Sequence, residues 1–171
     1  MNSIYKFLYN VFSLIPSKNT PDSKVVRLRV KFASKIFQRI GTGCNIQSGV
    51  RIRGALKNIQ IGDNSGIGIN SSLHAQGRIT IGNDVMIGQE LIIHTARHGT
   101  SREELMRKQG STYSDVTIGN NVWIGSRVTI LPGVTVSDNI VIGAGSIVTK
   151  DCTKSGIYAG NPAVFIKEME S

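Results

Sequence analysis

Aliphatic residues recur every six positions along most of this chain. Between residues 116 and 148 two sets of positions keep this interval: Ile118, Ile124, Ile130, Val136, Ile142 and Val148, and Val116, Val122, Val128, Val134 and Ile140. A helix repeats its apolar positions every three or four residues and a half-buried strand every two, so neither fits. A period of six predicts a solenoid in which each hexad forms one short side of a prism and buries its aliphatic side chains.

The same pattern extends toward the N-terminus and predicts about five coils. Hexads occupy residues 40–52, 61–73 and 81–93, with short slips between these blocks. Glycine, asparagine and aspartate follow the buried positions, as expected at tight corners that need positive φ or local side-chain hydrogen bonds. A Val/Ile-rich sandwich would not space its strands in unbroken sixes.

The repeat stops between Ile93 and Val116, where the polar segment 94–115 intervenes. A polar insertion of this length in a rigid scaffold predicts an extruded loop, the place where functional residues are expected. It contains two of the three histidines, His94 and His98.

The two ends of the chain lie outside the repeat, which occupies residues 40–152. Apolar spacing predicts helices within residues 1–39, and residues 153–171 form a tail expected to fold over the far end of the prism. The first apolar run is too short to span a bilayer and lacks the features of a secretory signal. Two roles stay open for the helices: covering the open end of the solenoid, or presenting a basic amphipathic surface to an anionic membrane or a lipid-linked glycan.

The net charge of +9 is concentrated in the N-terminal segment. Residues 1–40 hold eight Lys or Arg and one acid, Asp22, which gives 8 − 1 = +7, and the remaining residues contribute 12 − 10 = +2. A nearly neutral solenoid argues against a nucleic-acid partner. Cys44 and Cys152 show no CxxC spacing and are expected to pack as small apolar groups, which favours a reduced, cytoplasmic compartment.

Residues 41–167 resemble the hexapeptide-repeat acyltransferases, in particular the sugar and polysaccharide O-acetyltransferases related to maltose and galactoside acetyltransferases. The similarity is carried by IGNNVWIGSRVTILPGV, IGAGSIVTKD and GNPA, while RVKFASKIFQRIG and MRKQG are most similar to the branch that acts on surface glycans. The period predicts an all-β solenoid, a parallel β-helix. The resemblance, and not the period, implies the left hand of this helix, a homotrimer with active sites between subunits, and acetyl-CoA as the acyl donor.

The resemblance also implies direct transfer of an acetyl group to a sugar hydroxyl of a surface polysaccharide precursor or related glycan. His98 corresponds to the catalytic base of the family, and an imidazole suits that task because it titrates near neutrality. Asn70 matches the asparagine that binds the acceptor. Glu90 is either a carboxylate that orients the His98 imidazole or an ordinary solvated one, and His74 and His94 are expected to be polar corner residues.

Five further positions are expected to serve acetyl-CoA. Ser126 and Ala144 are eighteen residues apart, one full coil, so they should stack on one edge of the prism and offer main-chain N–H groups to the thioester and the pantetheine chain. Thr149 and Lys150 are expected to continue that edge, and Lys150 and Lys167 to meet the phosphates.

Trp123 is expected to face outward between two buried positions and to offer a flat surface to the acceptor or to pantetheine. A tryptophan of the core would be misplaced there. The family has a tryptophan at the same position.

Three competing functions use a similar fold. A γ-class carbonic anhydrase shares the β-helix, but His94 and His98 are four residues apart where that family has five, so no metal is expected. A glycan-binding trimer without activity and an N-acetyltransferase of a nucleotide amino sugar both stay open. The sequence does not identify the acceptor.

Overall fold

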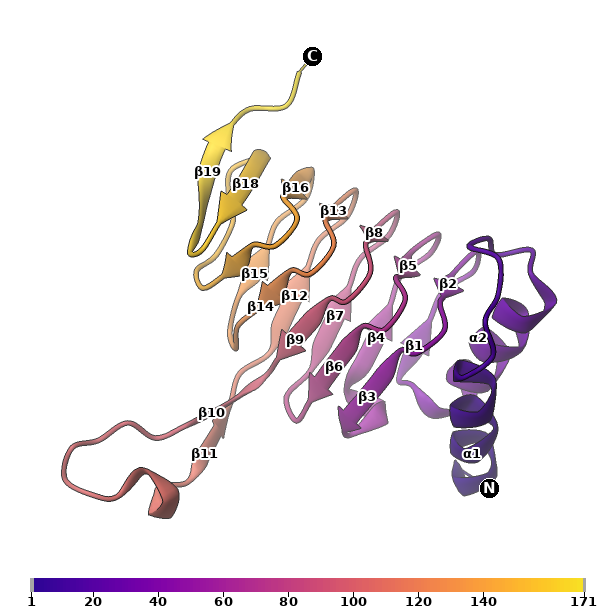
Figure 1. Cartoon of the computed structure of the whole chain (residues 1–171), viewed down its shortest axis with the longest axis horizontal. Coiled ribbons are helices and arrows are strands. Elements are labelled where there is room, and N and C mark those ends of the chain that lie inside the picture. The colour runs from indigo at the N-terminus through magenta and orange to yellow at the C-terminus, as the bar shows by residue number, and fades with distance from the viewer. Residues whose placement is uncertain (1, 171) are drawn as a thin grey trace.

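The computed structural model describes residues 2–170, and most of them form a parallel β-solenoid with three sides (Figure 1). Sheet A contains β1 (Arg39–Ile40), β4 (Ile59–Ile61), β7 (Ile79–Ile81), β12 (Val116–Ile118) and β15 (Thr135–Val136). Sheet B contains β2 (Asn45–Ile46), β5 (Gly66–Ile67), β8 (Met86–Ile87), β13 (Trp123–Ile124), β16 (Ile140–Ile142), β18 (Gly156–Gly160) and β19 (Ala163–Lys167). Sheet C contains β3 (Arg51–Gly54), β6 (Ser72–Ala75), β9 (Ile92–His94), β14 (Thr129–Ile130) and β17 (Ile147–Val148).

Each coil passes through sheets A, B and C in turn, and its strands pair in parallel with those of the next coil. Five complete coils lie within the described residues and β18 begins another, so the solenoid has about six turns where the sequence predicted about five. The period-six aliphatics point inward as expected: Ile118, Ile124, Ile130 and Ile142 are fully buried. The predicted prism is confirmed.

The three edges of the prism are tight corners. At the A/B edge, Asn121 and Asn139 adopt positive φ, as the sequence predicted for such turn residues. Asn120 and Asp138 contribute a hydrogen bond between coils: the Asp138 carboxylate accepts at 2.6 Å from the main-chain N–H of Asn120 in the neighbouring coil. Side-chain hydrogen bonds of this kind tie successive coils together at the corner.

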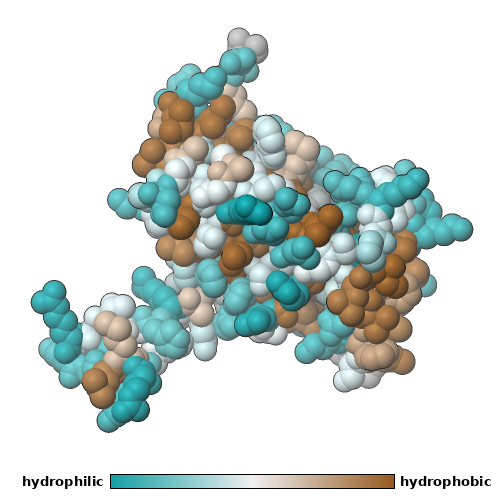
Figure 2. Space-filling view, viewed as in Figure 1, coloured by the Kyte–Doolittle hydropathy of each residue, from teal (hydrophilic) through white to brown (hydrophobic). Residues whose placement is uncertain are grey.

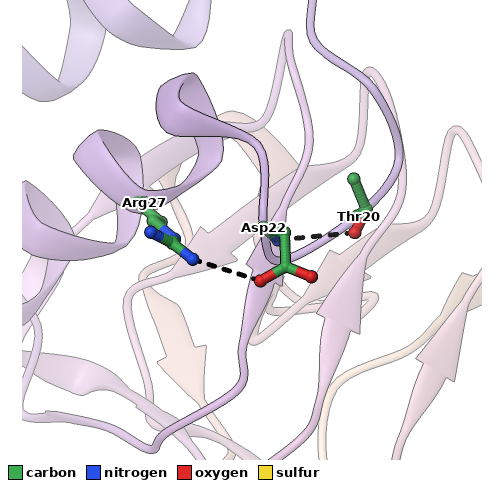
Figure 3. A network of polar contacts seen from close by, with 3 residues as sticks. All are labelled: Thr20, Asp22 and Arg27. Carbon is green, nitrogen blue, oxygen red and sulfur yellow. Dashed lines mark hydrogen bonds and ion pairs between the residues drawn. The ribbon is translucent and has the colours of Figure 1, made fainter.

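Two helices, α1 (Asn2–Ser13) and α2 (Lys24–Ile36), cover the first coil. Tyr9, Ala33 and Ile36 are buried in the same core as the solenoid aliphatics, so the expected covering role is confirmed. The loop between the helices is braced by the Asp22 carboxylate, which accepts a hydrogen bond of 3.2 Å from Arg27, and by the Thr20 hydroxyl, which accepts one from the Asp22 amide (Figure 3). No helix among residues 2–170 is both long and apolar enough to cross a membrane.

The insertion after β9 is a two-stranded antiparallel ribbon. Its strands are β10 (Ala96–His98) and β11 (Ser111–Tyr113), and η2 (Met106–Lys108) lies near its tip. The ribbon projects away from the prism (Figure 1), so the predicted extrusion is confirmed and has regular structure. A second short helix, η1 (Leu56–Asn58), lies at the C/A corner of the first coil.

The C-terminal tail forms an antiparallel hairpin of β18 and β19. Because β18 pairs in parallel with β16, the hairpin lengthens sheet B. The Tyr158 ring is buried and packs edge-on against Phe165, with ring centroids 5.5 Å apart. Cys44 and Cys152 are both buried and not disulfide-bonded, as expected of small core residues.

Candidate active site

The B/C edge of the prism carries one residue with positive φ in each of three successive coils: Asn70, Glu90 and Arg127, at 59°, 60° and 59°. The main-chain N–H group of each residue donates a hydrogen bond to a carbonyl of the preceding coil. The Glu90 N–H, for example, donates to the Ile69 carbonyl at 2.8 Å. Asparagine tolerates this conformation better than most residues do, whereas glutamate and arginine seldom adopt it. Asn121 and Asn139 of the A/B edge also have positive φ, so this conformation marks the corners of the prism and does not by itself identify the site.

Asn70 and Glu90 face the same shallow depression, on the side of the edge formed by sheet C. Arg51, Ser72 and Ile92 complete its lining. Gly49 lies in the coil before Asn70 and has positive φ, and a Cβ atom there would collide with the Asn70 amide oxygen. The absence of a side chain at Gly49 therefore determines where the Asn70 amide lies.

Glu90 is held by an arginine of the next coil. Its Oε2 atom lies 2.9 Å from Nε of Arg127; the Arg127 side chain is largely exposed and that of Glu90 is partly exposed. The two charges neutralise one another at the edge. Within one protomer the Glu90 carboxylate is paired with Arg127, and the His98 imidazole contacts Ser111; an orienting role of Glu90 toward His98 stays a prediction.

Ser126 and Ala144 stack on the same B/C edge, one coil apart, as the sequence predicted. The Gly145 N–H donates to the Ser126 carbonyl at 2.8 Å, and Ala144 is exposed. A Cβ atom at Gly125 would lie only 2.5 Å from the Ala144 nitrogen. Because glycine has no Cβ atom, the two coils can approach one another closely at this point. Asn70, Glu90, Ser126 and Ala144 therefore follow one another along a single edge.

Thr149 and Lys150 do not continue this edge, contrary to the prediction. They follow β17, whereas Ala144 precedes it, so the whole width of sheet C separates the two pairs. The reason is the hexad itself, because six residues carry the chain from one corner to the next. Thr149 and Lys150 are exposed at the C/A edge.

Trp123 lies on the outer face of sheet B with 53% of its surface exposed. The strand register places it in a row with Met86, Val141, Ile157 and Lys167. Trp123 and Lys167 thus share one face of the prism, next to the edge that carries Ser126 and Ala144. The Lys167 ammonium also pairs with Glu170 at 3.1 Å in an exposed contact.

His98 is exposed at the end of β10, opposite Ser111 in β11. The Ser111 hydroxyl lies 3.3 Å from Nδ1 of the imidazole. When Nδ1 carries the proton and donates to this hydroxyl, Nε2 is free to accept a proton. Ser111 was missed by the sequence reasoning, and only the antiparallel register of the ribbon would have revealed it.

Thr95 fixes the base of the ribbon to the prism wall. Its buried hydroxyl donates to the His74 carbonyl at 2.6 Å and accepts from the Gly77 amide at 2.9 Å. Its own carbonyl accepts from the Ser114 amide at 2.8 Å. His98 is therefore carried about 10 Å from the wall, three residues beyond a rigid anchor.

The other two histidines form a pair on the outer face of sheet C. The rings of His74 and His94 are 4.6 Å apart, and the Ser72 hydroxyl lies 3.2 Å from Nε2 of His74. Partial burial lowers the pKa of His74, and the nearby His94 and Arg53 lower it further. Among residues 2–170 no three His, Cys, Asp or Glu side chains gather closely enough to hold a metal ion.

The predicted site residues thus fall into two sets on one protomer. The first set lies on the B/C edge and on the adjoining face of sheet B: Asn70, Ser126, Ala144, Trp123 and Lys167. The second set belongs to the C/A edge, where Thr149 and Lys150 lie and from which the ribbon with His98 projects. About five residues of extended chain, roughly 16 Å, separate the edges across sheet C.

The family comparison agrees with the motifs. A family model described as the hexapeptide repeat of succinyl-transferase matches residues 115–150. Galactoside O-acetyltransferase of Escherichia coli K12 is 39% identical over 145 residues, which cover 84% of this chain and 70% of the relative. The chain belongs to the hexapeptide-repeat acetyltransferases.

Solved structures of other hexapeptide-repeat acetyltransferases have the same fold. A maltose O-acetyltransferase from Clostridium difficile 630 superposes with a TM-score of 0.80 at 32% identity, covering 99% of this chain and 87% of that one. A galactoside acetyltransferase in complex with coenzyme A gives a TM-score of 0.82 at 34% identity, covering 99% and 80%. A fold shared over nearly the whole chain includes the ribbon and the terminal helices.

The exposed groups of this acetyltransferase suit coenzyme A. Ala144 is exposed along a narrow edge, where the Gly145 N–H is already bonded to the Ser126 carbonyl, and Lys150 and Lys167 are exposed cations that would pair with phosphates. Trp123 presents an exposed flat ring on the same face as Lys167. These residues would hold the long, partly apolar and partly anionic donor.

Proposed function

We propose that the protein is an acetyl-CoA-dependent O-acetyltransferase that acetylates a hydroxyl of a sugar, such as one in a surface polysaccharide precursor. One observation carries the proposal: Asn70, Ser126 and Ala144 are stacked along a single edge. Acetyl-CoA supplies the acetyl group as a thioester. The related galactoside and maltose acetyltransferases support the same reaction class.

His98 acts as the general base in this proposal. Its Nε2 atom accepts the proton of the acceptor hydroxyl while that oxygen bonds to the acetyl carbon, and it returns the proton to the thiolate released when the carbon–sulfur bond breaks. Ser111 retains the proton on Nδ1 through its contact of 3.3 Å. Neither redox chemistry nor a covalent enzyme intermediate is required.

The B/C edge positions the other groups. Main-chain N–H groups at Ser126 and Ala144 donate to the thioester oxygen and to pantetheine as negative charge develops. The Asn70 amide holds the acceptor in the depression that it shares with Arg51. Trp123 covers the donor or the sugar and Lys167 engages the distal part of acetyl-CoA, while Thr149 and Lys150, which lie on the C/A edge like the base of the ribbon, would reach the donor from an adjoining protomer.

Two protomers complete one site in this proposal. His98 and the Asn70 edge lie on different sides of the same prism, so a ring of subunits in which one C/A edge meets the next B/C edge would unite them. The trimer implied by the family supplies such a ring. Buried, unpaired cysteines and an acetyl-CoA donor support a cytoplasmic site of action.

The test is release of the coenzyme A thiol from acetyl-CoA in the presence of a panel of neutral and amino sugars. Wild-type protein should release thiol with a hydroxyl acceptor. His98→Ala should lower kcat by about 10²-fold or more while leaving the fold intact. Arg97→Ala, the neighbouring exposed position on the same ribbon, is the matched control and should keep nearly full activity.

Retention of full activity by His98→Ala would remove the base assignment. Turnover with amino sugars alone would instead make the protein an N-acetyltransferase. Binding of sugars without any thiol release would make it a glycan-binding module.

A further inference from the structure

Helix α1 and Leu14, the residue that follows it, expose an apolar stripe. Ile4, Phe7, Val11 and Leu14 follow one another at intervals of three and four residues, and 64% of Phe7 and 77% of Leu14 are exposed. The opposite face of the helix is buried through Tyr9. Figure 2 shows a continuous hydrophobic area at lower right, where Figure 1 places the two helices. The stripe is therefore additional to the surface that covers the solenoid.

Helix α2 exposes a basic stripe beside it. Lys24, Arg27, Lys31 and Lys35 recur at intervals of three and four and are exposed. The buried face of the helix contains Val26, Ala33 and Ile36. The only acid in residues 1–40, Asp22, is paired with Arg27 at 3.2 Å, so Lys24, Lys31 and Lys35 keep their charge unbalanced.

The two stripes lie on neighbouring helices. Helix α2 packs on the first coil and α1 packs mainly on α2, partly through Phe12 and Phe32, whose ring centroids are 5.3 Å apart. On the other flank of α1, a hollow contains two further lysines and is lined by Ser3, Lys6, Ile36, Ala55, Leu56 and Lys57. Positive charge thus borders the apolar stripe on both sides.

This surface suits one kind of partner. A second copy of the chain related by a two-fold axis would bring lysines toward lysines, because residues 1–40 offer no free carboxylate to meet them. A bilayer containing anionic lipids offers both phosphates for the lysines and an apolar interior for Phe7 and Leu14. Apolar stripes rimmed by lysine are the usual form of helices that lie in a membrane interface.

We infer that the outer face of the α1–α2 pair is a docking surface for an anionic lipid bilayer, in which α1 enters the headgroup region and the α2 lysines contact lipid phosphates. The inference does not depend on the proposed acetyl transfer. Docking would hold the solenoid with its first coil toward the bilayer.

The test is co-sedimentation of the purified protein with phosphatidylcholine vesicles, with and without phosphatidylglycerol. Wild-type protein should bind only the vesicles that contain phosphatidylglycerol, and more weakly as salt is added. The double variant Phe7→Ser/Leu14→Ser should bind at least about tenfold more weakly. The double variant Lys31→Glu/Lys35→Glu should lose about tenfold or more in vesicle affinity, since each basic residue near the membrane surface contributes about fivefold to that affinity.

Two matched controls separate docking from general adhesion. Ile166→Ser removes an exposed apolar residue of β19, at the other end of the solenoid, and Arg102→Glu reverses a charge on the ribbon. Both should bind vesicles as wild type does. All the substituted side chains are exposed, so circular dichroism should show an unchanged fold.

Three results would overturn the inference. The first is no binding to phosphatidylglycerol vesicles, and the second is binding that neither double variant weakens. The third is sedimentation velocity showing that wild-type assemblies pair in solution and that Phe7→Ser/Leu14→Ser separates them, because another copy of the chain would then cover the stripe. Acetyltransferase activity on a free sugar should be unchanged in both double variants, which keeps this test distinct from that of the proposed function.

Discussion

Arg29 is the charged residue whose replacement should most affect the stability of the N-terminal cap. It is completely buried, and its guanidinium donates to the carbonyls of Phe12 at 2.8 Å and Ile46 at 3.0 Å, to the Ser17 hydroxyl at 2.9 Å, and to the carbonyl of Ile15. Burial lowers the pKa of the guanidinium, but arginine remains protonated. One side chain thus joins the end of α1, the helix connection and the first coil.

The cost of removing these donors can be worked from the contacts. Arg29→Met fills much of the space but leaves three main-chain carbonyls without their donor. Each orphaned acceptor costs about 1–3 kcal/mol when it stays dry, and only the Ile46 contact is completely buried, so the lower end applies to the others. A total of about 4 kcal/mol corresponds to a fall in Tm of about 10 °C for a chain of this size.

The assay is thermal unfolding followed by circular dichroism, at one protein concentration because assembly shifts Tm. Arg27→Met, on the same helix but in an exposed ion pair with Asp22, is the matched control and should change Tm by no more than about 2 °C. Arg29→Lys should be intermediate, since it keeps the charge but loses the forked geometry. An Arg29→Met protein as stable as Arg27→Met would refute this reasoning.

Three further changes have defined outcomes. Tyr9→Phe should raise Tm by about 2 °C, because the buried Tyr9 hydroxyl has no hydrogen-bond partner within the described residues; a fall in Tm in the same melting experiment would contradict this. Since the folded-state pKa of His74 is lowered, the unfolded chain binds more protons, so stability should be full above about pH 6.5 and decline as the pH falls through the folded pKa. Melts between pH 7 and pH 5 should show a smaller decline in His74→Gln, and an identical slope would exclude the effect. Gly49→Ala should displace the Asn70 amide and raise the acceptor KM by about tenfold without changing the KM for acetyl-CoA; equal changes in both constants would indicate general damage.

The fold could be predicted from the sequence because the hexad pattern is repeated in every coil. Ile118, Ile124 and Ile130 mark three sides of one coil, and each repetition of the pattern reinforces the assignment. The hand of the coil does not follow from that period. The ribbon was anticipated only as a loop, since Ala96–His98 and Ser111–Tyr113 are short strands that pair across a long polar turn.

The site was predicted in part. Stacking of Ser126 over Ala144 follows from a spacing of eighteen residues, a distance of one coil. Lys150 is six residues beyond Ala144. Since six residues carry the chain from one edge to the next, the spacing would have placed Lys150 on the C/A edge. The pairing of Glu90 with Arg127 joins residues separated by the ribbon insertion, and spacing alone does not reveal such contacts.

The central claim is that one catalytic centre combines His98 of one protomer with the Asn70 edge of another. His98→Ala and Asn70→Ala proteins carrying different affinity tags can be co-expressed and the mixed assemblies purified through both tags. Each parent should be nearly inactive. In the proposed trimer, every mixed assembly contains one junction at which an intact His98 meets an intact Asn70, so its activity should be about one third of wild type. Mixed trimers no more active than their parents would contradict the shared site and place both residues in the same protomer's catalytic centre.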